Sequence, residues 1–204
     1  MDPRRRKTID ALIGAAEQLF SERAADEVTV EELAEHAGVA VGSIYNHFGS
    51  KAGLYAATLD RALDADEAYM NRAFSPERSP IEQLVAAGHE HLQFYIDHPA
   101  LFRMLAFPPE PGHYAASTDV ADAIGKRIDQ QLERIADAIE RGIATGQVAP
   151  IDPRATATIM WAAANGIISL AWRSDKQRRS VDEVRALLDT LDMYLAGALV
   201  RGDR

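Results

Sequence analysis

Apolar residues that recur every three or four positions run through most of the chain, and no other feature of the sequence constrains the fold as strongly. In an α-helix such positions share one face, which can be buried against a neighbouring element. The longest stripe is formed by Val120, Ile124, Ile128, Leu132, Ile135, Ile139 and Ile143. No segment shows the convincing alternation of apolar and polar residues that a half-buried strand requires. The sequence therefore predicts an all-α fold.

Residues typical of helix ends divide this pattern into separate helices. Thr29 and Glu32 have the spacing of a capping box, and Gly38 is placed to leave that helix in a left-handed conformation. Ser79 and Glu82 repeat the same start signal further along the chain. The expected helices span about residues 9–23, 30–37, 41–48, 51–73, 80–98, 101–107, 120–143, 155–172 and 184–200.

The composition limits the classes of protein to which the chain can belong. With 204 residues, 47% of them hydrophobic, the chain is long enough to bury a core. It contains no cysteine, which excludes disulfides, thiolate metal sites and cysteine nucleophiles and fits a reducing compartment. No run of 18 or more apolar residues predicts a membrane span, and the basic start lacks the apolar run of a signal peptide. We therefore expect a soluble, cytoplasmic protein that contacts no membrane.

Three positions between residues 30 and 48 meet the steric requirements of a helix-turn-helix. A small residue, Ala34, allows two helices to cross closely, and Gly38 reverses the chain without a clash of a Cβ atom. Ile44 then anchors the second helix, so that the opposite face of this helix is free to enter the major groove of DNA. Short helical hairpins with a glycine are common, and the spacing alone only suggests this motif.

The residue types around this turn are more specific than their spacing. Residues 29–34 read TVEELA, and residues 37–51 read AGVAVGSIYNHFGSK. With these segments, residues 8–55 strongly resemble the DNA-binding domain of the TetR family of repressors. The resemblance implies an N-terminal three-helix DNA-binding domain, assigned to residues 1–55. It also implies a helical-bundle domain for ligand binding and dimerisation, assigned to residues 56–204.

Three residues depart from the usual pattern of the family. Ala24 lies where a glycine often ends the first helix. Ala40 lies where a serine often caps the second helix of the motif, residues 41–48, which is called the reading helix because it contacts the bases. Gly53 lies where an acidic residue often completes a capping box with Ser50. A lost cap typically costs ~1 kcal/mol, which softens a helix end without abolishing the fold. We therefore expect a reading helix that is more mobile before it meets DNA.

The resemblance also assigns DNA contacts to individual positions. Residues at the start of the reading helix face base edges, whereas a tyrosine and a histidine further along hold phosphates through the hydroxyl group and the ring N–H. Residues at the starts of the neighbouring helices add phosphate contacts. The implied DNA-binding residues are Thr29, Val41, Gly42, Ser43, Tyr45, Asn46, His47 and Lys51. Two simpler interpretations stay open, with Tyr45 as a core aromatic and His47 as a solvated surface residue.

The charge of the chain does not by itself favour a nucleic-acid partner. The formal net charge is -9, and residues 1–55 hold six Lys or Arg against nine Asp or Glu. Phosphate binding requires well-placed cations, which a basic N-terminal arm at residues 4–7 can supply. The same arm is equally compatible with a frayed, solubilising terminus. We therefore expect a modest affinity for DNA with a moderate salt dependence.

Aromatic residues of the C-terminal part suit the walls of a ligand cavity, because such cavities need bulky apolar sides and a few polar groups. Trp161, Asn165 and Trp172 share one helical face, although ordinary core packing is an equally good interpretation of each aromatic. The predicted ligand-binding residues are His91, Phe94, Tyr95, Phe102, Phe107, Trp161 and Asn165. They predict a largely apolar, aromatic or amphipathic small-molecule effector.

A metal site and an enzyme active site are poorer interpretations. His89 and His91 are two positions apart and point to different sides of a helix, whereas a helical metal motif needs histidines four apart. His98 and His113 are near to them only in the sequence. The chain has no phosphate-binding loop, nucleophile elbow or spaced carboxylate pair. We expect no catalytic residue, no metal and no cofactor.

The last two expected helices predict how the chain assembles. Residues 155–172 are apolar nearly all round and residues 184–200 carry a broad apolar stripe, so both need cover on more than one side. The same helices of a second copy can provide this cover, or both helices can complete the core of one chain. We expect a homodimeric repressor of a palindromic operator, which a small effector releases by shifting residues 50–73. A helical interaction module and an effector-independent regulator are the alternatives.

Overall fold

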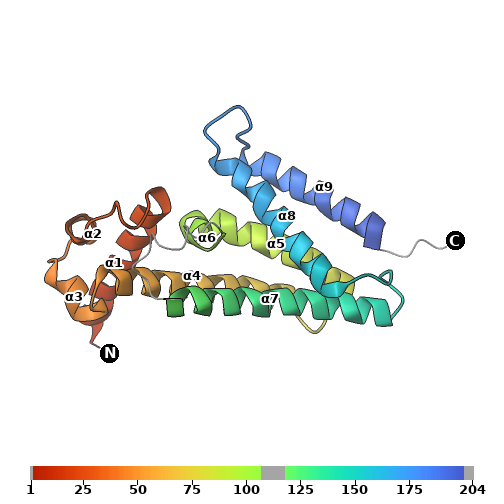
Figure 1. Cartoon of the computed structure of the whole chain (residues 1–204), viewed down its shortest axis with the longest axis horizontal. Helices are drawn as coiled ribbons and strands as arrows, with labels where there is room; N and C mark the ends of the chain where they lie inside the picture. Colours follow the sequence, from red (N-terminus) through yellow and green to blue (C-terminus); the bar gives the residue numbers. More distant parts are fainter. Residues whose placement is uncertain (1, 107–117, 200–204) are drawn as a thin grey trace. The chain divides into compact units, whose positions relative to one another are not determined.

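The computed structural model describes residues 2–106 and 118–199, and every regular element in these ranges is a helix (Figure 1). The all-α fold expected from the sequence is confirmed. By their contacts the residues form two compact units: unit 1 comprises residues 1–65 and 98–126, and unit 2 comprises residues 66–97 and 127–204. Phe107 and His113 lie outside the described residues. The functional boundary after residue 55 is a separate prediction, which these contacts do not test.

Unit 1 contains the helix-turn-helix. Its helices are α1 (Pro3–Glu22), α2 (Val30–Ala37), α3 (Gly42–Phe48), the first part of α4 (Lys51–Ala73), α6 (Pro99–Ala106) and the start of α7 (Thr118–Ala144). One core joins them, in which Leu12 of α1, Leu33 of α2 and Ile44 of α3 are completely buried. Helix α6 packs on α1 and adds Met104 to this core.

Helix α1 begins earlier than expected. The side chain of Asp2 accepts a hydrogen bond from the backbone N–H of Arg4 at 2.9 Å, and Pro3 occupies the first turn, where a proline is favourable. Residues 4–7 are therefore helical, which contradicts the alternative of a frayed terminus, and the contact of this basic arm with DNA stays a prediction. Asp2 and Pro3 form a helix-start signal, and the helix therefore includes the basic residues that follow them.

Unit 2 is a bundle of helices around a second core. It contains the rest of α4, α5 (Pro80–Asp97), most of α7, α8 (Pro153–Ser169), the 3-10 helix η1 (Leu170–Trp172) and α9 (Val181–Leu199). The expected capping box starts α5: the N–H of Ser79 donates to Glu82 Oε2 at 2.7 Å, and the N–H of Glu82 donates to Ser79 Oγ at 3.3 Å. Ile135 and Ile139 of the long α7 stripe are buried in the core of this unit, as their spacing predicts.

Two boundaries near the C-terminus differ from the expected ones. Helix α8 ends at Ser169, and Trp172 lies in the tighter helix η1. Helix α9 begins at Val181 rather than at residue 184, because Ser180 and Glu183 form a further capping box with hydrogen bonds of 2.8 and 3.3 Å. The spacing of this serine and glutamate is visible in the sequence, so this helix start is within the reach of sequence reasoning.

One helix of the described ranges has the length and apolar composition of a membrane span. It covers Pro153–Trp172, and 28% of its most apolar window is buried in this single chain. The core helix of a soluble protein passes the same test. Here α8 contacts α5 and α9, and the side chains of Asn165 and Ile168 are buried. Much of the apolar surface of α8 stays open in one chain.

The glycine at position 53 has a steric reason. A Cβ atom there would overlap the backbone carbonyl oxygen of Phe48, and the N–H of Gly53 donates to Ser50 Oγ at 3.0 Å. The chain turns sharply from α3 into α4 at Gly49, whose φ of 74° lies in the region that favours glycine. This close approach excludes the acidic residue that the family resemblance leads one to expect at position 53.

We predict that Gly53→Ala lowers the free energy of unfolding by about 1–3 kcal/mol, the usual cost of forcing extra atoms into a packed site. Gly14→Ala is the matched control, because Gly14 also lies in a helix and no atom lies within 4 Å of its Cβ position. That substitution should raise the stability by about 0.5–1 kcal/mol. Urea unfolding followed by circular dichroism measures both changes. Equal effects of the two substitutions would contradict the steric explanation.

Candidate DNA interface and ligand site

The turn between α2 and α3 has the geometry of a helix-turn-helix. Gly38 has a φ of 66°, in the left-handed region, and the N–H of Val39 donates to the carbonyl oxygen of Ala34 at 2.9 Å. Ala34 and Ile44 are both buried in the core that joins the two helices. All three positions therefore have the steric roles that the sequence predicts.

The face of α3 away from Ile44 is open. Tyr45 is 53% exposed, so the interpretation of this residue as a core aromatic is wrong. No side chain caps the start of α3, in agreement with the loss of a serine at position 40. Of the other predicted contacts at this helix, Gly42 and Asn46 are exposed, and Val41, Ser43 and His47 are half-buried. The positions expected to meet DNA are thus accessible to different degrees.

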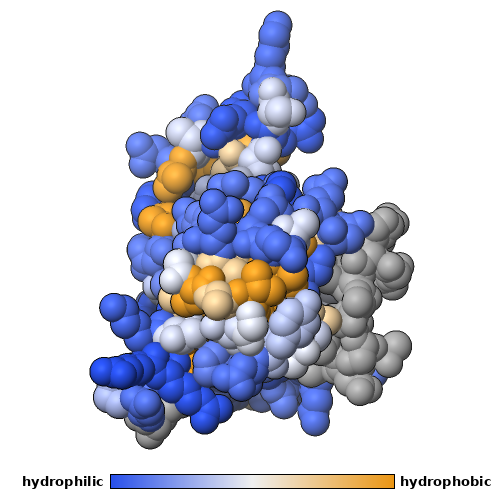
Figure 2. Space-filling model, turned by 90° about the vertical axis from the view of Figure 1, so that its left-hand side faces the viewer, coloured by the Kyte–Doolittle hydropathy of each residue, from blue (hydrophilic) through white to orange (hydrophobic). Residues whose placement is uncertain are grey.

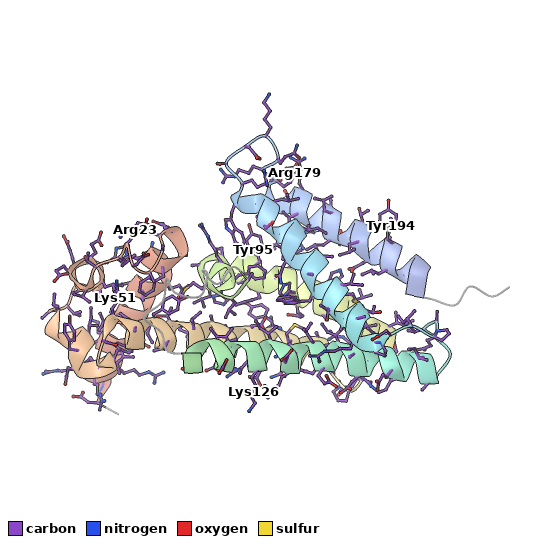
Figure 3. All side chains as sticks on the ribbon, viewed as in Figure 1. Arg23, Lys51, Tyr95, Lys126, Arg179 and Tyr194 are labelled. Carbon is purple, nitrogen blue, oxygen red and sulfur yellow. The ribbon has the colours of Figure 1, made fainter. Side chains whose placement is uncertain are left out.

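Two positive side chains near this face are engaged within the chain. Lys51 Nζ donates to the backbone carbonyls of Ala25 at 2.8 Å and Val28 at 2.7 Å, so two of its three donors hold the loop between α1 and α2 (Figure 3). Arg23 forms an ion pair with Glu32 at 3.0 Å. Hydrophilic residues cover most of the face shown in Figure 2, and hydrophobic residues form a group on it. Lys51 and Arg23 stabilise this unit from within.

Thr29 caps α2 through the expected capping box. Its Oγ1 accepts from the N–H of Glu32 at 3.1 Å and donates to Glu32 Oε2 at 3.0 Å, and the same carboxylate accepts from the Thr29 N–H at 2.8 Å. The backbone hydrogen bond, followed by those from Arg23 and the Thr29 hydroxyl, holds the pKa of Glu32 below its usual range. A carboxylate so close to Thr29 disfavours a phosphate, and the contact of Thr29 with DNA stays a prediction.

His47 contains a buried nitrogen that lacks a hydrogen-bond partner in the part of the chain that the structure describes. This atom is Nδ1, and the ring packs edge-on against Phe48 with 6.4 Å between centroids. Such a buried, unsatisfied group costs about 1–3 kcal/mol. His47 is half-buried as a whole, so its interpretation as a solvated surface residue and its contact with DNA both stay predictions.

Two of the predicted ligand residues meet in unit 2. His91 Nε2 of α5 lies 3.0 Å from Asn165 Oδ1 of α8, and Asn165 is buried. Phe94 and Tyr95 of α5 are also buried, and the Tyr95 ring packs edge-on against Trp172 with 5.3 Å between centroids. A polar pair among aromatic side chains is the arrangement that a ligand site needs.

The other three predicted ligand residues lie in different parts of the chain. Trp161 of α8 is half-buried, Phe102 is buried in unit 1, and Phe107 lies outside the described residues. The assignment of these three residues to the ligand site stays a prediction.

Two residues of α4 belong to the same neighbourhood, and sequence reasoning missed them. The ring of Tyr69 packs against Phe94 with 5.5 Å between centroids, and its hydroxyl donates to Asp97 Oδ2 at 2.7 Å. Burial raises the pKa of Asp66, which interacts electrostatically with His91. A signal for Asp66 exists in the sequence, because it lies three positions before Tyr69, on the apolar stripe of the helix.

The histidines of α5 point to different partners. His89 Nε2 lies 3.9 Å from carboxylate oxygens of both Asp189 and Asp192, whereas His91 meets Asn165. No group of three side chains suited to a metal ion occurs within residues 2–106 and 118–199. The absence of a metal from the function stays a prediction.

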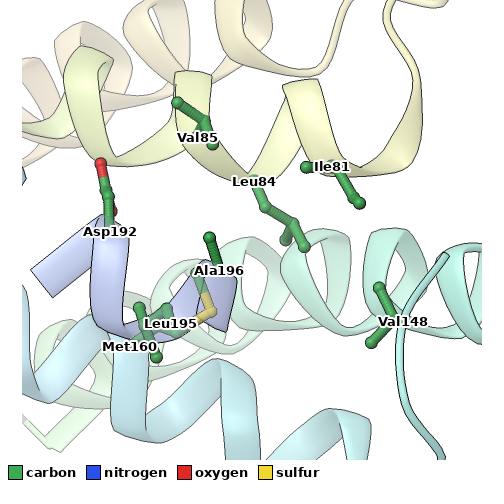
Figure 4. A pocket seen from close by; sticks show the side chains of 8 residues that line it. All are labelled: Ile81, Leu84, Val85, Val148, Met160, Asp192, Leu195 and Ala196. Carbon is green, nitrogen blue, oxygen red and sulfur yellow. The ribbon is translucent and has the colours of Figure 1, made fainter. Parts of the chain in front are cut away.

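A small pocket of about 40 Å³ lies between α5, α8 and α9 (Figure 4). This volume holds only a few water molecules. Its charged lining residue is Asp192, whose pKa is raised by burial. The lining residues are Ile81, Leu84, Val85, Val148, Met160, Asp192, Leu195 and Ala196. None of them belongs to the predicted ligand set, so this pocket is not the predicted effector site.

Family models match both parts of the chain. The model of bacterial regulatory proteins, tetR family, matches residues 12–58, and the model of the tetracyclin repressor-like C-terminal domain matches residues 84–194. The chain belongs to the TetR family. It is therefore a DNA-binding transcriptional regulator and not an enzyme.

Two proteins of similar sequence agree with the assignment to the TetR family. Nucleoid occlusion factor SlmA of Vibrio campbellii is 28% identical over 188 residues, which cover 91% of this chain and 93% of SlmA. HTH-type transcriptional regulator RutR of Escherichia coli is 27% identical over 152 residues, which cover 74% of this chain and 69% of RutR.

Solved structures have the same fold. A TetR-family regulator from Agrobacterium tumefaciens has a TM-score of 0.75 and 19% identity, covering 97% of this chain and 100% of its own. A proposed regulator from Saccharomonospora viridis, solved in complex with choline, has a TM-score of 0.77 and 18% identity, covering 98% of this chain and 100% of its own. At these identities the similarity concerns the fold alone.

For this TetR-family protein we predict that His47→Phe raises the melting temperature and weakens specific DNA binding. The substitution removes an unsatisfied nitrogen that costs about 1–3 kcal/mol, and it also removes the ring N–H assigned to a phosphate. His36→Ala is the control, because His36 is an exposed histidine with a partner, Gln18 Oε1 at 2.6 Å. Differential scanning fluorimetry and fluorescence anisotropy measure the two effects. A variant that loses stability would refute the account of Nδ1.

We predict that Lys51→Gln weakens DNA binding by loosening the loop between α1 and α2 rather than by removing a phosphate contact. Each phosphate contact contributes about 0.9 to the slope of log K against log salt. The melting temperature and the affinity should fall while this slope stays nearly unchanged. Lys7→Gln is the control for the loss of one charge. A slope that falls by about 0.9 in the Lys51 variant would instead establish the phosphate contact implied by the family.

Proposed function

We propose that this TetR-family protein is a ligand-responsive repressor. A homodimer binds a palindromic operator, and a small, largely apolar effector releases it. The observation that carries this proposal is the reading helix α3, which buried Ile44 anchors and which presents exposed Tyr45. One helix of seven residues contacts too few base pairs to select a site in a genome. Two copies of the chain supply two such helices.

The proposed DNA contacts divide into readout and positioning. Val41, Gly42 and Ser43 at the start of α3 read base edges, while Tyr45 and His47 hold phosphates. The Cβ position of Gly42 has no atom within 4 Å, which favours a close approach of the backbone to DNA. In this proposal residues 1–55 bind DNA, and residues 56–204 bind the ligand and dimerise.

The surface of α8 and α9 supports a homodimer. Ile159 of α8 is 62% exposed, and Met193 and Tyr194 of α9 are 69% and 72% exposed, with Tyr194 directed away from its helix (Figure 3). Large apolar side chains as open as these gain free energy when another surface covers them. Pairing of α8 and α9 with the same helices of a second copy would cover them.

The proposed effector site lies at the pair of His91 and Asn165 and its aromatic neighbours. Helix α4 is continuous from Lys51 to Ala73 and contributes to both units, so a ligand that shifts it acts on the DNA-binding unit. A coupling of ~1–3 kcal/mol between two sites changes operator affinity about 5- to 150-fold. The complex of the Saccharomonospora viridis protein with choline supports small-molecule binding by this fold. A repressor that binds chromosomal DNA of a bacterium acts in the cytoplasm, and this is the location that we propose for the protein.

An effector-independent regulator is the second candidate. The similarity to SlmA favours it, because this similarity covers 91% of the chain and SlmA is named as a nucleoid occlusion factor rather than as a ligand-responsive regulator. Measurement of the operator affinity with and without a bound ligand distinguishes the two candidates. Only the ligand-responsive repressor should lose affinity for the operator when the ligand binds.

We predict that selection from genomic fragments enriches a palindromic sequence and that Met193→Lys lowers the affinity for it. A lysine in an apolar interface must lose its water shell, so the dimer should dissociate and each chain should keep only one half-site. Analytical ultracentrifugation gives the oligomeric state, and anisotropy of a labelled operator gives the affinity. Gln130→Lys on the exposed side of α7 is the control for the added charge. A Met193→Lys protein that remains dimeric with full affinity would refute the proposed interface.

A further inference from the structure

Asn165 of α8 is a buried polar residue in unit 2. Its side chain meets the ring of His91 on α5, with 3.0 Å between His91 Nε2 and Asn165 Oδ1, and the residue is only 7% exposed. The oxygen of a side-chain amide accepts hydrogen bonds and cannot donate them, so the histidine nitrogen is the donor in this contact. The contact therefore occupies the oxygen of the amide and leaves the N–H donors of its nitrogen, Nδ2, for another partner.

The amide nitrogen of Asn165 is without a partner in the part of the chain that the structure describes. There the hydrogen bond with His91 is the polar contact of this side chain. The side-chain atom that is both unpaired and fully enclosed in residues 2–106 and 118–199 belongs to His47, so Asn165 Nδ2 still borders accessible space. A donor at the end of a nearly buried side chain gains free energy from an acceptor that enters this space.

Apolar and aromatic side chains lie one helical turn from this amide. Tyr95, four positions after His91 on the same face of α5, packs edge-on against Trp172 with 5.3 Å between ring centroids. Ile168, one turn after Asn165 on α8, is completely buried. His91 and Trp172 are half-buried, so each of the two contacts between α5 and the segment of α8 and η1 has one member that reaches solvent. The site thus presents a hydrogen-bond donor beside an apolar, aromatic surface.

We propose that the effector carries an uncharged carbonyl group, as in a ketone, an ester, a lactone or an amide, and that Asn165 Nδ2 donates a hydrogen bond to the carbonyl oxygen. This inference rests on the proposed function and adds one hydrogen-bond acceptor to the largely apolar effector. A carboxylate would need a cation beside it to offset the loss of its water. Tyr95, Ile168 and Trp172 carry no charge, and they suit the apolar body of an uncharged molecule.

Three small molecules that share a phenylethyl body and a flat head group test this proposal on the full chain. The ketone is benzylacetone, the hydrocarbon is its analogue with a C=CH₂ group in place of C=O, and the anion is hydrocinnamate. In a proton–nitrogen NMR spectrum of the isotope-labelled chain, the ketone should shift the side-chain amide resonances of Asn165, and the hydrocarbon should not.

Three results of this comparison would overturn the inference. The first is that benzylacetone does not bind, and the second is that it binds without a shift of the Asn165 amide resonances. The third is that hydrocinnamate binds more tightly than benzylacetone, because the head group would then be an anion. Isothermal titration calorimetry gives the affinities.

Substitution of Asn165 tests the hydrogen bond through the affinities of two ligands. Asn165→Asp replaces the donor by an acceptor and keeps an oxygen for His91. The ratio of the benzylacetone affinity to the hydrocarbon affinity should fall about tenfold, which corresponds to about 1.4 kcal/mol. Comparing this ratio between two proteins removes the difference in hydrophobicity between the two ligands. Asn71→Asp is the matched control, because Asn71 is exposed on α4, and it should leave the ratio unchanged.

An unchanged ratio in the Asn165→Asp protein would assign the amide to packing and overturn the inference. If this variant does not fold, the shifts of the Asn165 amide resonances on the unsubstituted chain decide.

Operator binding separates this inference from the proposed function. If benzylacetone binds in an Asn165-dependent way without changing operator affinity, the carbonyl site stands and ligand-induced release is refuted. If hydrocinnamate or the hydrocarbon releases the operator equally well from the unsubstituted chain and from Asn165→Asp, ligand-induced release stands and the carbonyl-bearing effector is refuted.

Discussion

Helix α3 has seven residues, fewer than an isolated helix needs to persist in water. Its position therefore depends on the burial of Ile44 in the core formed by α1, α2, α4 and α6. The contacts on the outer face of α3 have a defined geometry only while this core is intact. Because α6 contributes Met104 to the same core, a change in the packing of α6 would reach the reading helix as directly as a shift of α4.

Polar contacts fix the segments that the core does not reach. Thr29 and Glu32 satisfy each other at the start of α2, and Arg23 joins the same carboxylate. Lys51 binds the carbonyls of the loop before α2 and so links the first turn of α4 to that helix start. These groups look like DNA ligands by residue type, yet their hydrogen bonds are made within the protein. These contacts hold the loop and the start of α2 without DNA, which lowers the cost of ordering these segments on binding.

Local features of this chain could be predicted from sequence, and tertiary ones could not. The capping box at Thr29 and the turn at Gly38 depend on residues a few positions away, and both occur as predicted. The role of Lys51 depends on carbonyls 23 and 26 residues earlier, which no local pattern reveals. Asp66 interacts electrostatically with His91 of α5 and with Arg127 and Arg134 of α7, which lie far from it in the sequence. The DNA and ligand contacts themselves stay predictions, because they depend on molecules that the sequence does not specify.

The acidic composition of the DNA-binding part bears on how specificity arises. Of six Lys or Arg in residues 1–55, Arg23 and Lys51 are engaged within the protein, and Arg6 lies 3.9 Å from the carboxylate of Asp10. We therefore expect a weak attraction of this unit to DNA phosphates. A weak attraction lowers the affinity for non-specific DNA more than the affinity for an operator, which also contacts the outer face of α3. The ratio of specific to non-specific affinity rises although the affinity of one copy falls. In the proposed homodimer, pairing of two copies would restore affinity, since the binding free energies of two half-sites combine. An acidic chain would then discriminate between sites because it relies less on charge.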